Sequence, residues 1–241
     1  VKNFEKNGIN FYCGVPDSVL SKLILYLDKY KLKKHLICAN EGGAVGLAIG
    51  NYLSSGKVSC VYMQNSGLGN AINPLVSIAH SKIYSIPMLL TIGWRGAPYI
   101  KDEPQHLKQG SITKDLLRLL NIKYIEIKNN KSLEKISSLL HYSKKNKKIV
   151  AILIKKNCLK LSKKIKFKNI KSKRIDRSFF IEKLILQTKK NFKIISNTGY
   201  ISRDLYRLRD KDETYNDFYM IGGMGHAQMV SYGVANFSKK N

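Results

Sequence analysis

Apolar runs of strand length alternate with amphipathic stretches of helix length from residue 1 to residue 156. A parallel sheet built from β-α-β units produces this alternation, because each crossover between parallel strands needs a connecting helix. Several runs are apolar throughout, which favours strands buried on both faces of the sheet. The expected strands are residues 9–13, 36–39, 58–63, 87–92, 124–127 and 149–154. We therefore predict an α/β fold, with a parallel sheet flanked by helices.

A lysine-dense stretch at residues 157–177 interrupts this pattern and shows no helical stripe. We interpret it as a basic linker between one domain at 1–156 and a second at 178–241. The second domain starts a new series, with helices expected at 178–189, 199–209 and 226–237 and strands at 193–196 and 218–221. Five elements would leave an open sheet edge and a thin core. We therefore expect this α/β domain to be truncated.

The net charge of +27 raises the question of a nucleic-acid partner. The positive charge comes mostly from lysine, and it lacks the interleaved aromatic residues that bind single-stranded nucleic acid. We expect no specific nucleic-acid partner. A basic, nucleic-acid-associated, non-enzymatic protein remains the alternative from another functional class.

The cellular setting is expected to be the cytoplasm. No apolar run approaches the roughly 20 residues of a membrane-spanning helix, and no signal-peptide pattern precedes the first strand. The chain opens on Val1 rather than Met, which predicts a trimmed start. The four cysteines lie far apart without a Cys-x-x-Cys pair, which favours reduced core residues and argues against a zinc site.

Two acidic residues follow the first two predicted strands, where ligands bind to parallel sheets. Asp17, in Gly-Val-Pro-Asp-Ser, is either a catalytic carboxylate or the N-cap of a helix at 18–27. Glu41 stands between the second strand and a helix rich in Gly and Ala. It is either a first-turn carboxylate favoured by the helix dipole or a buried acid directed at a ligand, and taken alone the pattern favours the former.

Two polar segments follow the third and fourth strands. The third strand leads to Asn65 and Gly67 in a Gly-x-Gly turn, whose backbone amides could hold a phosphate. This turn lacks the Lys-Ser/Thr of a P-loop and the third Gly of a dinucleotide fingerprint. The fourth strand leads to a long polar loop at 93–110 with Arg95, His106 and Gln109. Long loops in compact domains are usually functional or disordered, and Arg and His can bind an oxyanion.

Two strand-to-helix turns in the second domain are candidates for binding an anion or a heteroaromatic ring. For two of the candidates there is a purely structural alternative: Met224 could pack in the core, and His226 could form a hydrogen bond at the start of a helix. The residues concerned are Thr198, Gly199 and Ser202 in the first turn and Gly222, Met224 and His226 in the second.

Taken together, these segments resemble the phosphonopyruvate decarboxylase family of thiamine-diphosphate-dependent 2-oxoacid decarboxylases, which are lyases, with sulfopyruvate decarboxylase as a close relative. The segments are GVPDS, NEGGAVGLAIG, QNSGLGNAINPL, GWRG followed by DEPQH and QG, NTGYISRD and GGMGHA. The resemblance runs essentially end to end. It implies a pyrimidine-binding domain followed by a diphosphate-binding domain, with thiamine diphosphate and Mg²⁺ as cofactors. It also implies a homo-oligomer of two or more subunits whose active site lies between subunits.

The resemblance also implies residue roles. Glu41 matches the family glutamate that hydrogen-bonds the aminopyrimidine ring and promotes deprotonation of the thiazolium carbon. Met224 matches the bulky residue that supports the bent cofactor. The residues expected to bind the cofactor are Glu41, Asn65, Gly67, Thr198, Gly199, Ser202, Gly222, Met224 and His226.

The implied reaction converts 3-phosphonopyruvate to phosphonoacetaldehyde and carbon dioxide in phosphonate biosynthesis, with sulfopyruvate as the alternative substrate. Arg95, His106 and Gln109 are expected to bind the anionic substrate through charge-assisted hydrogen bonds. His106 and Asp17 are further catalytic candidates. Asp17 lies near the position of a catalytic Asp in pyruvate decarboxylases, although the loop around it differs by a residue.

The family's magnesium motif, Gly-Asp-Gly with a downstream Asn, is expected to begin shortly after Asn241. We therefore expect the chain to be the N-terminal two-thirds of its protein and to contain no metal ligand of its own. Without the counter-charge of the metal, this piece alone is expected to bind the cofactor poorly and to be inactive.

Overall fold

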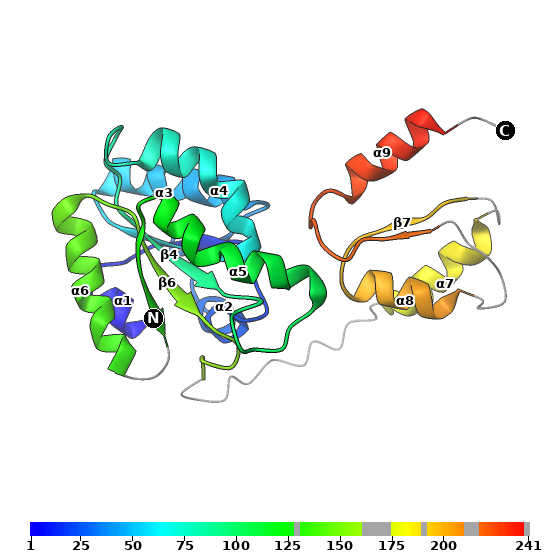
Figure 1. Ribbon diagram of the computed structural model, residues 1–241, viewed down its shortest axis with the longest axis horizontal. Helices are drawn as coiled ribbons and strands as arrows, with labels where there is room; N and C mark the ends of the chain where they lie inside the picture. Colours follow the sequence, from blue (N-terminus) through cyan, green and yellow to red (C-terminus); the bar gives the residue numbers. More distant parts are fainter. Residues whose placement is uncertain (128–130, 161–174, 189–191, 210–216, 239–241) are drawn as a thin grey trace. The chain divides into compact units, whose positions relative to one another are not determined.

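The computed structural model describes residues 1–127, 131–160, 175–188, 192–209 and 217–238. Chain contacts divide the protein into unit 1, Val1–Lys166, and unit 2, Phe167–Asn241 (Figure 1). The linker predicted at 157–177 lies mostly outside the described residues, and the domain limits of 1–156 and 178–241 stay predictions. Each unit is described by itself.

Unit 1 is built on one sheet of six parallel strands in the order β2-β1-β3-β4-β6-β5. The strands are β1 Tyr12–Gly14, β2 His35–Ile37, β3 Ser59–Gln64, β4 Met88–Gly93, β5 Lys123–Ile127 and β6 Val150–Ile154. The predicted α/β fold with a parallel sheet is confirmed, with strand ends shifted by a few residues. β1 pairs with β2 on one side and with β3 on the other. The chain therefore reverses its direction of progress across the sheet at β1 and β3, which is where open α/β sheets bind ligands.

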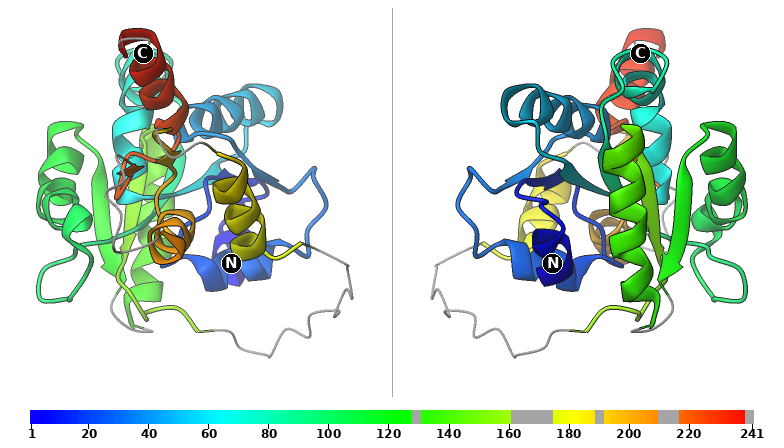
Figure 2. Two further views of the ribbon diagram at one scale, coloured as in Figure 1. Left: turned by 90° about the vertical axis from the view of Figure 1, so that its right-hand side faces the viewer. Right: turned by 90° about the vertical axis from the view of Figure 1, so that its left-hand side faces the viewer.

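Helices cover both faces of this sheet (Figures 1 and 2). One core lies under α3 Glu41–Ser55, α4 Leu68–Pro74 and α5 Pro104–Leu119, and the other under α1 Lys2–Lys6, α2 Ser21–Leu27 and α6 Lys131–Asn146. β3 shows the cause, since Cys60 and Tyr62 enter one core while Val61 and Met63 enter the other. Two short helical turns, η1 Asn65–Gly67 and η2 Leu75–Ala79, flank α4.

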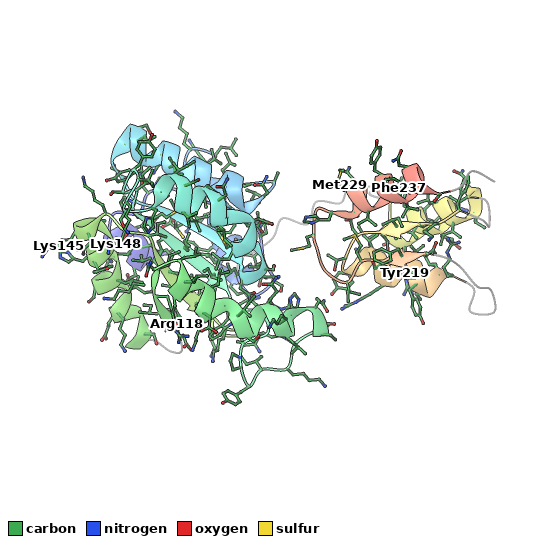
Figure 3. All side chains as sticks on the ribbon, turned by 45° about the horizontal axis from the view of Figure 1, so that its top comes forward. Arg118, Lys145, Lys148, Tyr219, Met229 and Phe237 are labelled. Atoms are coloured by element: carbon green, nitrogen blue, oxygen red, sulfur yellow. The ribbon has the colours of Figure 1, made fainter. Side chains whose placement is uncertain are left out.

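Unit 2 contains two parallel strands, β7 Ile195–Ser196 and β8 Phe218–Tyr219. Its helices are α7 Arg177–Gln187, α8 Tyr200–Leu208 and α9 Ala227–Phe237, so all five expected elements are present. Few apolar side chains are buried among the described residues of this unit, and Met229 and Phe237 of α9 are 67% and 84% exposed (Figure 3). A thin core was expected from so few elements.

Two local expectations were wrong. The helix predicted at 18–27 begins only at Ser21, and no side chain caps it. The predicted loop at 93–110 is shorter, because α5 already begins at Pro104. Proline is well placed at a helix start, since its missing N–H would have no partner inside the helix. Among the described residues, no helix is long and apolar enough to cross a membrane.

Candidate active site

The polar residues singled out in unit 1 follow different strands of the parallel sheet. Asp17 follows β1, Glu41 follows β2, Asn65 follows β3 and Arg95 follows β4. Because parallel strands end at one edge of a sheet, the fold brings these residues to the same edge.

Glu41 is the first residue of α3 and is only 5% exposed. The helix start is fixed by Asn40, whose Oδ1 accepts a hydrogen bond of 2.7 Å from the backbone N–H of Gly43. The carboxylate of Glu41 faces inward, where Asn70 of α4 donates from Nδ2 to Oε2 at 2.9 Å. The helix-dipole and ligand-directed interpretations both remain compatible with this position, but the side chain does not lie on the outer surface.

Gly67 lies against the Glu41 carboxylate. A Cβ atom added to Gly67 would come closer than 3.0 Å to Oε1, Cδ and Cγ of Glu41. Only glycine leaves space for the carboxylate at this point. No described residue donates a hydrogen bond to Oε1, and Oε1 is not one of the buried atoms without a partner, so it reaches solvent.

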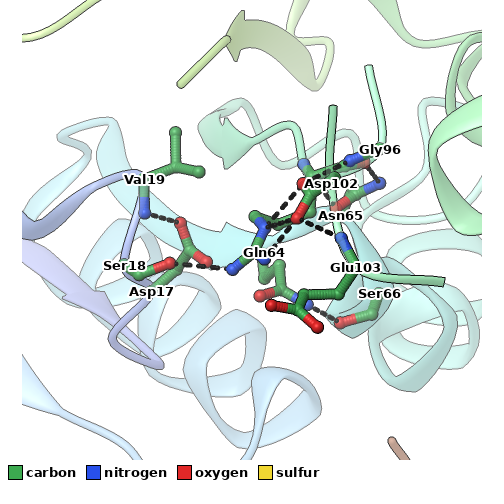
Figure 4. Close-up of polar contacts among 10 residues, drawn as sticks. Asp17, Ser18, Val19, Gln64, Asn65, Ser66, Gly96, Asp102 and Glu103 are labelled. Carbon is green, nitrogen blue, oxygen red and sulfur yellow. Dashed lines mark hydrogen bonds and ion pairs between the residues drawn. The ribbon is translucent and has the colours of Figure 1, made fainter. Parts of the chain in front are cut away.

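Asp17 is 7% exposed and is held by the backbone rather than by a side chain. Its Oδ2 accepts a hydrogen bond of 2.7 Å from the N–H group of Val19 (Figure 4) and one of 3.1 Å from that of Leu20. Its Oδ1 is buried and has no partner among the described residues. Burial therefore raises the pKa of Asp17 above its ordinary value, against the lowering effect of these N–H groups and of Arg95.

Arg95 is clamped by a carboxylate that the sequence analysis did not single out, that of Asp102. Arg95 Nε donates to Asp102 at 3.0 Å and 2.8 Å, and Nη2 forms a further contact to Oδ1. Asp102 also accepts from the N–H groups of Gly96 at 2.8 Å and Glu103 at 2.9 Å (Figure 4). The hydrogen bonds from Arg95 hold the pKa of Asp102 well below its ordinary value. The Arg95 guanidinium is thus already paired with a carboxylate.

Asn65 joins two of the loops at this edge. Its Nδ2 donates to the carbonyl of Arg95 and to Thr113 Oγ1, both at 2.9 Å, and its Oδ1 accepts from Arg95 N at 3.1 Å. Both amide hydrogens are therefore used inside the protein. The Asn65 side chain therefore has no N–H left to donate to a cofactor.

His106 and Gln109 lie on the first turns of α5, and both are half-buried. Burial, reinforced by the nearby Arg95 charge, lowers the pKa of His106 below its ordinary value. Their helix starts very close to the loop, because Cβ atoms added to Gly96 or Gly110 would overlap the carbonyls of His106 and Gly96, respectively. The structure therefore places His106 near Arg95, while no described contact joins it to Glu41.

The two turns of unit 2 contain the remaining candidates. Gly199, at φ 91°, precedes α8, and Gly223 and Gly225 take φ values of 62° and 88° before α9. Ser202 is used internally, donating to Asn197 O at 2.6 Å and contacting Ser196 Oγ at 2.8 Å. Met224 is 52% exposed within this unit, so the core-packing alternative was wrong for it. His226 Nδ1 lies 3.1 Å from the carbonyls of Gly223 and Met224 in the turn before α9, and the side chain makes no capping hydrogen bond to the helix.

Four side chains that contact the candidate residues were missed from the sequence: Asn70, Asp102, Thr113 and Ser18, which accepts from Arg95 Nη1 at 3.0 Å. Asn70 lies three residues after Gly67 on the same turn, a spacing that places the two near each other on a helix. Asp102 lies seven residues after Arg95, across a turn, and only its opposite charge pointed to a pair. Among the described residues, no cluster of three or more His, Cys, Asp or Glu side chains could hold a metal ion.

Comparisons with known proteins agree on one family. The model for "Thiamine pyrophosphate enzyme, N-terminal TPP binding domain" matches residues 1–117. Phosphonopyruvate decarboxylase from Streptomyces viridochromogenes is 32% identical, over 95% of this chain and 60% of that protein. Sulfopyruvate decarboxylase subunit alpha from Methanothermobacter thermautotrophicus is 32% identical over 61% of this chain and 87% of that subunit. Its counterpart from Methanococcus maripaludis is 36% identical over 51% and 71%.

The chain spans about 60% of the length of the phosphonopyruvate decarboxylases it matches. Among solved structures, benzoylformate decarboxylase from Polynucleobacter necessarius superposes with a TM-score of 0.50 at 16% identity, over 80% of this chain and 36% of that one. This structural likeness shows a shared fold.

Proposed function

Because the chain belongs to the thiamine pyrophosphate enzymes, in the group that contains phosphonopyruvate and sulfopyruvate decarboxylases, we propose that it acts in the decarboxylation of 3-phosphonopyruvate. The products are phosphonoacetaldehyde and carbon dioxide, and the place of the reaction is phosphonate biosynthesis. The observation that carries the proposal is the Glu41 carboxylate, inward-facing and with one oxygen open to a donor.

The residues around Glu41 fit the aminopyrimidine end of thiamine diphosphate. Asn70 holds Oε2, so the carboxylate cannot rotate without losing that bond, and Oε1 remains for a ring N–H. Gly67 keeps the space beside Oε1 free of side-chain atoms. When bound, thiamine diphosphate supplies the nucleophilic carbon and the electron sink of the reaction.

Glu41 then holds and moves a proton at Oε1, and such positioned proton transfer contributes about 10²–10⁴-fold to rate. Asn70 is a positioning residue, because it touches Glu41 and not the reacting atoms. Asp17 and His106 remain catalytic candidates at the same sheet edge. We propose that Gly222, Met224 and His226 meet the aminopyrimidine, and that the turn with Thr198, Gly199 and Ser202 approaches the diphosphate. The open glycine conformations and exposed Met224 support these contacts.

Magnesium would neutralise the diphosphate in this scheme, through oxygen ligands. We propose a homo-oligomer that shares its active sites between subunits.

Glu41→Gln in the holoenzyme tests the proposal. The amide keeps the size of the side chain but cannot take up the proton, so we expect kcat to fall by at least about 100-fold with little change in thermal stability. Carbon dioxide release from 3-phosphonopyruvate measures the first quantity and thermal unfolding the second. Unaltered turnover by Glu41→Gln would contradict the mechanism.

Sulfopyruvate is the second candidate substrate. It is favoured by the match to the alpha subunits of sulfopyruvate decarboxylases, of which the chain covers 68% to 87%. Comparing kcat/KM for phosphonopyruvate, sulfopyruvate and pyruvate in the same preparation decides between them. A preference for pyruvate would remove the oxyanion role from the site.

A further inference from the structure

A polar cavity of about 250 Å³ opens at the carboxyl ends of β1, β4 and β6. Its lining includes Ser18 before α2, Ser21 and Lys22 at the start of α2, Arg95 after β4, and Lys156 and Asn157 after β6. The volume far exceeds the roughly 10–15 Å³ that one water requires, so a hydrated ionic group can enter. We propose that this cavity binds the tetrahedral oxyanion on C3 of the 2-oxoacid substrate, with Lys22 and Lys156 as its counter-charges. This inference rests on the proposed function.

The charge of the cavity is one-sided. No Asp or Glu lines it, and neither Lys22 nor Lys156 pairs with a carboxylate among the described residues. Other lysines at this edge differ, since Lys155 lies 3.8 Å from Glu126 Oε2 and Lys114 lies 2.5 Å from Glu126 Oε1. An anion in the cavity would therefore meet two ammonium groups without competition from a carboxylate.

Arg95 contributes through Ser18 as well as directly. Its Nη1 donates to Ser18 Oγ at 3.0 Å. Because that oxygen accepts, the hydroxyl hydrogen of Ser18 is free to donate to a ligand. Since Asp102 holds the guanidinium from its other side, Arg95 acts as a fixed support for Ser18.

This placement revises the substrate contacts expected from the sequence. Neither His106 nor Gln109 lines the cavity, and Arg95 already forms an ion pair with Asp102. Lysine binds phosphate-like groups as a point charge, without the planar geometry that Arg requires. Two ammonium groups match a phosphonate, which can carry two negative charges, better than a sulfonate, which carries one.

The test uses Lys22→Gln, Lys156→Gln and the double variant in the holoenzyme. Lys145→Gln is the matched control, because α6 ends near Lys145 and leads into the opposite, amino end of β6 (Figure 3). We expect each cavity variant to lower kcat/KM for phosphonopyruvate about tenfold, as loss of one charge-assisted hydrogen bond predicts. Turnover of pyruvate, which has no oxyanion on C3, should stay within about twofold, and Lys145→Gln should change neither.

Two results would overturn the inference: unchanged kcat/KM for phosphonopyruvate in the double variant, or an equal loss with pyruvate. The sulfopyruvate arm identifies the head group, since a larger loss for phosphonopyruvate supports a doubly charged ligand, and a larger loss for sulfopyruvate contradicts it. Titration of methylphosphonate into the protein, followed by NMR, tests the cavity without turnover. Binding should weaken in the double variant and persist in Lys145→Gln. If the wild type decarboxylates none of the three acids, the proposed function fails, while this titration still decides whether the cavity binds the oxyanion.

Discussion

Gly67→Ala is the substitution that most directly tests how Glu41 is held. The added carbon would lie closer than 3.0 Å to three atoms of the Glu41 side chain, and such overpacking costs about 1–3 kcal/mol. The flexible member of the contact is the Glu41 side chain, so we expect the carboxylate to move away and to weaken its 2.9 Å hydrogen bond from Asn70.

A displacement of about 1 Å at a reacting group lowers the rate by about 10²-fold. This corresponds to about 2.7 kcal/mol in the activation barrier. We therefore expect kcat/KM of the holoenzyme for phosphonopyruvate to fall about 100-fold in Gly67→Ala, with a modest decrease in Tm. Carbon dioxide release under saturating cofactor measures the first effect, and thermal unfolding the second.

Gly69→Ala is the control from the same turn, because an added Cβ there meets nothing within 4 Å. It should change activity by no more than about twofold. A double-mutant cycle adds a sharper criterion, since residues that act through one another are not additive. If Gly67 acts through Glu41, Gly67→Ala should lower activity further by little in a Glu41→Gln background. Full additivity, or a Gly67→Ala enzyme as active as Gly69→Ala, would refute the reasoning.

Three other substitutions probe the surroundings of the site. Asp102→Asn removes the carboxylate whose pKa Arg95 lowers, so we expect the free energy of unfolding at pH 7 to fall by about 3 kcal/mol. A lowered pKa stabilises the fold fully above the unfolded pKa of about 3.9 and progressively less as the pH falls from there through the folded pKa, so urea unfolding should show this deficit shrinking below about pH 3.9. Asp17→Asn should raise Tm at pH 7, because burial raises the pKa of Asp17 and penalises its charge, and the gain should shrink as the pH falls through that raised pKa toward 4; an equal gain at both pH values would contradict this. Gly110→Ala would overlap the backbone of the preceding loop and should lower stability by about 1–3 kcal/mol, whereas Gly46→Ala, with open space around it, should not.

The sheet could be predicted because its signal is local and repeated. In β3 successive residues from Cys60 to Met63 enter the two cores in turn, so the run had to be apolar throughout, and that is visible in the sequence. The start of α2 was missed for the opposite reason. Asp17 accepts from Val19 and Leu20 as an N-cap would, but it closes a separate turn before the helix, and sequence spacing does not distinguish the two.

The candidate site could be predicted only as far as strand ends reveal it. Asp17, Glu41, Asn65 and Arg95 were found because each follows a strand. Their partners come from other elements, and such contacts depend on how helices pack against the sheet. Asn70 and Glu41 are 29 positions apart in the sequence, and Thr113 and Asn65 are 48 apart. No periodicity in the sequence carries information over such separations. The cavity with Lys22 and Lys156 was missed for the same reason, as its members lie on three separate segments.

The carboxylates at this sheet edge are in different environments, and the difference bears on function. Asp102 is fully engaged by Arg95 and two backbone N–H groups, which suits a structural charge. Asp17 keeps a buried oxygen with no partner, an arrangement that destabilises the folded state when the group is charged. A chain selected only for stability would replace such a group with Asn or an apolar residue. Acid–base sites are characteristically built from titratable groups whose surroundings separate their pKa values. The unfavourable burial of Asp17, near an Arg95 that is already paired with Asp102 and at the same edge as Glu41, therefore argues that this edge of the sheet is maintained for chemistry.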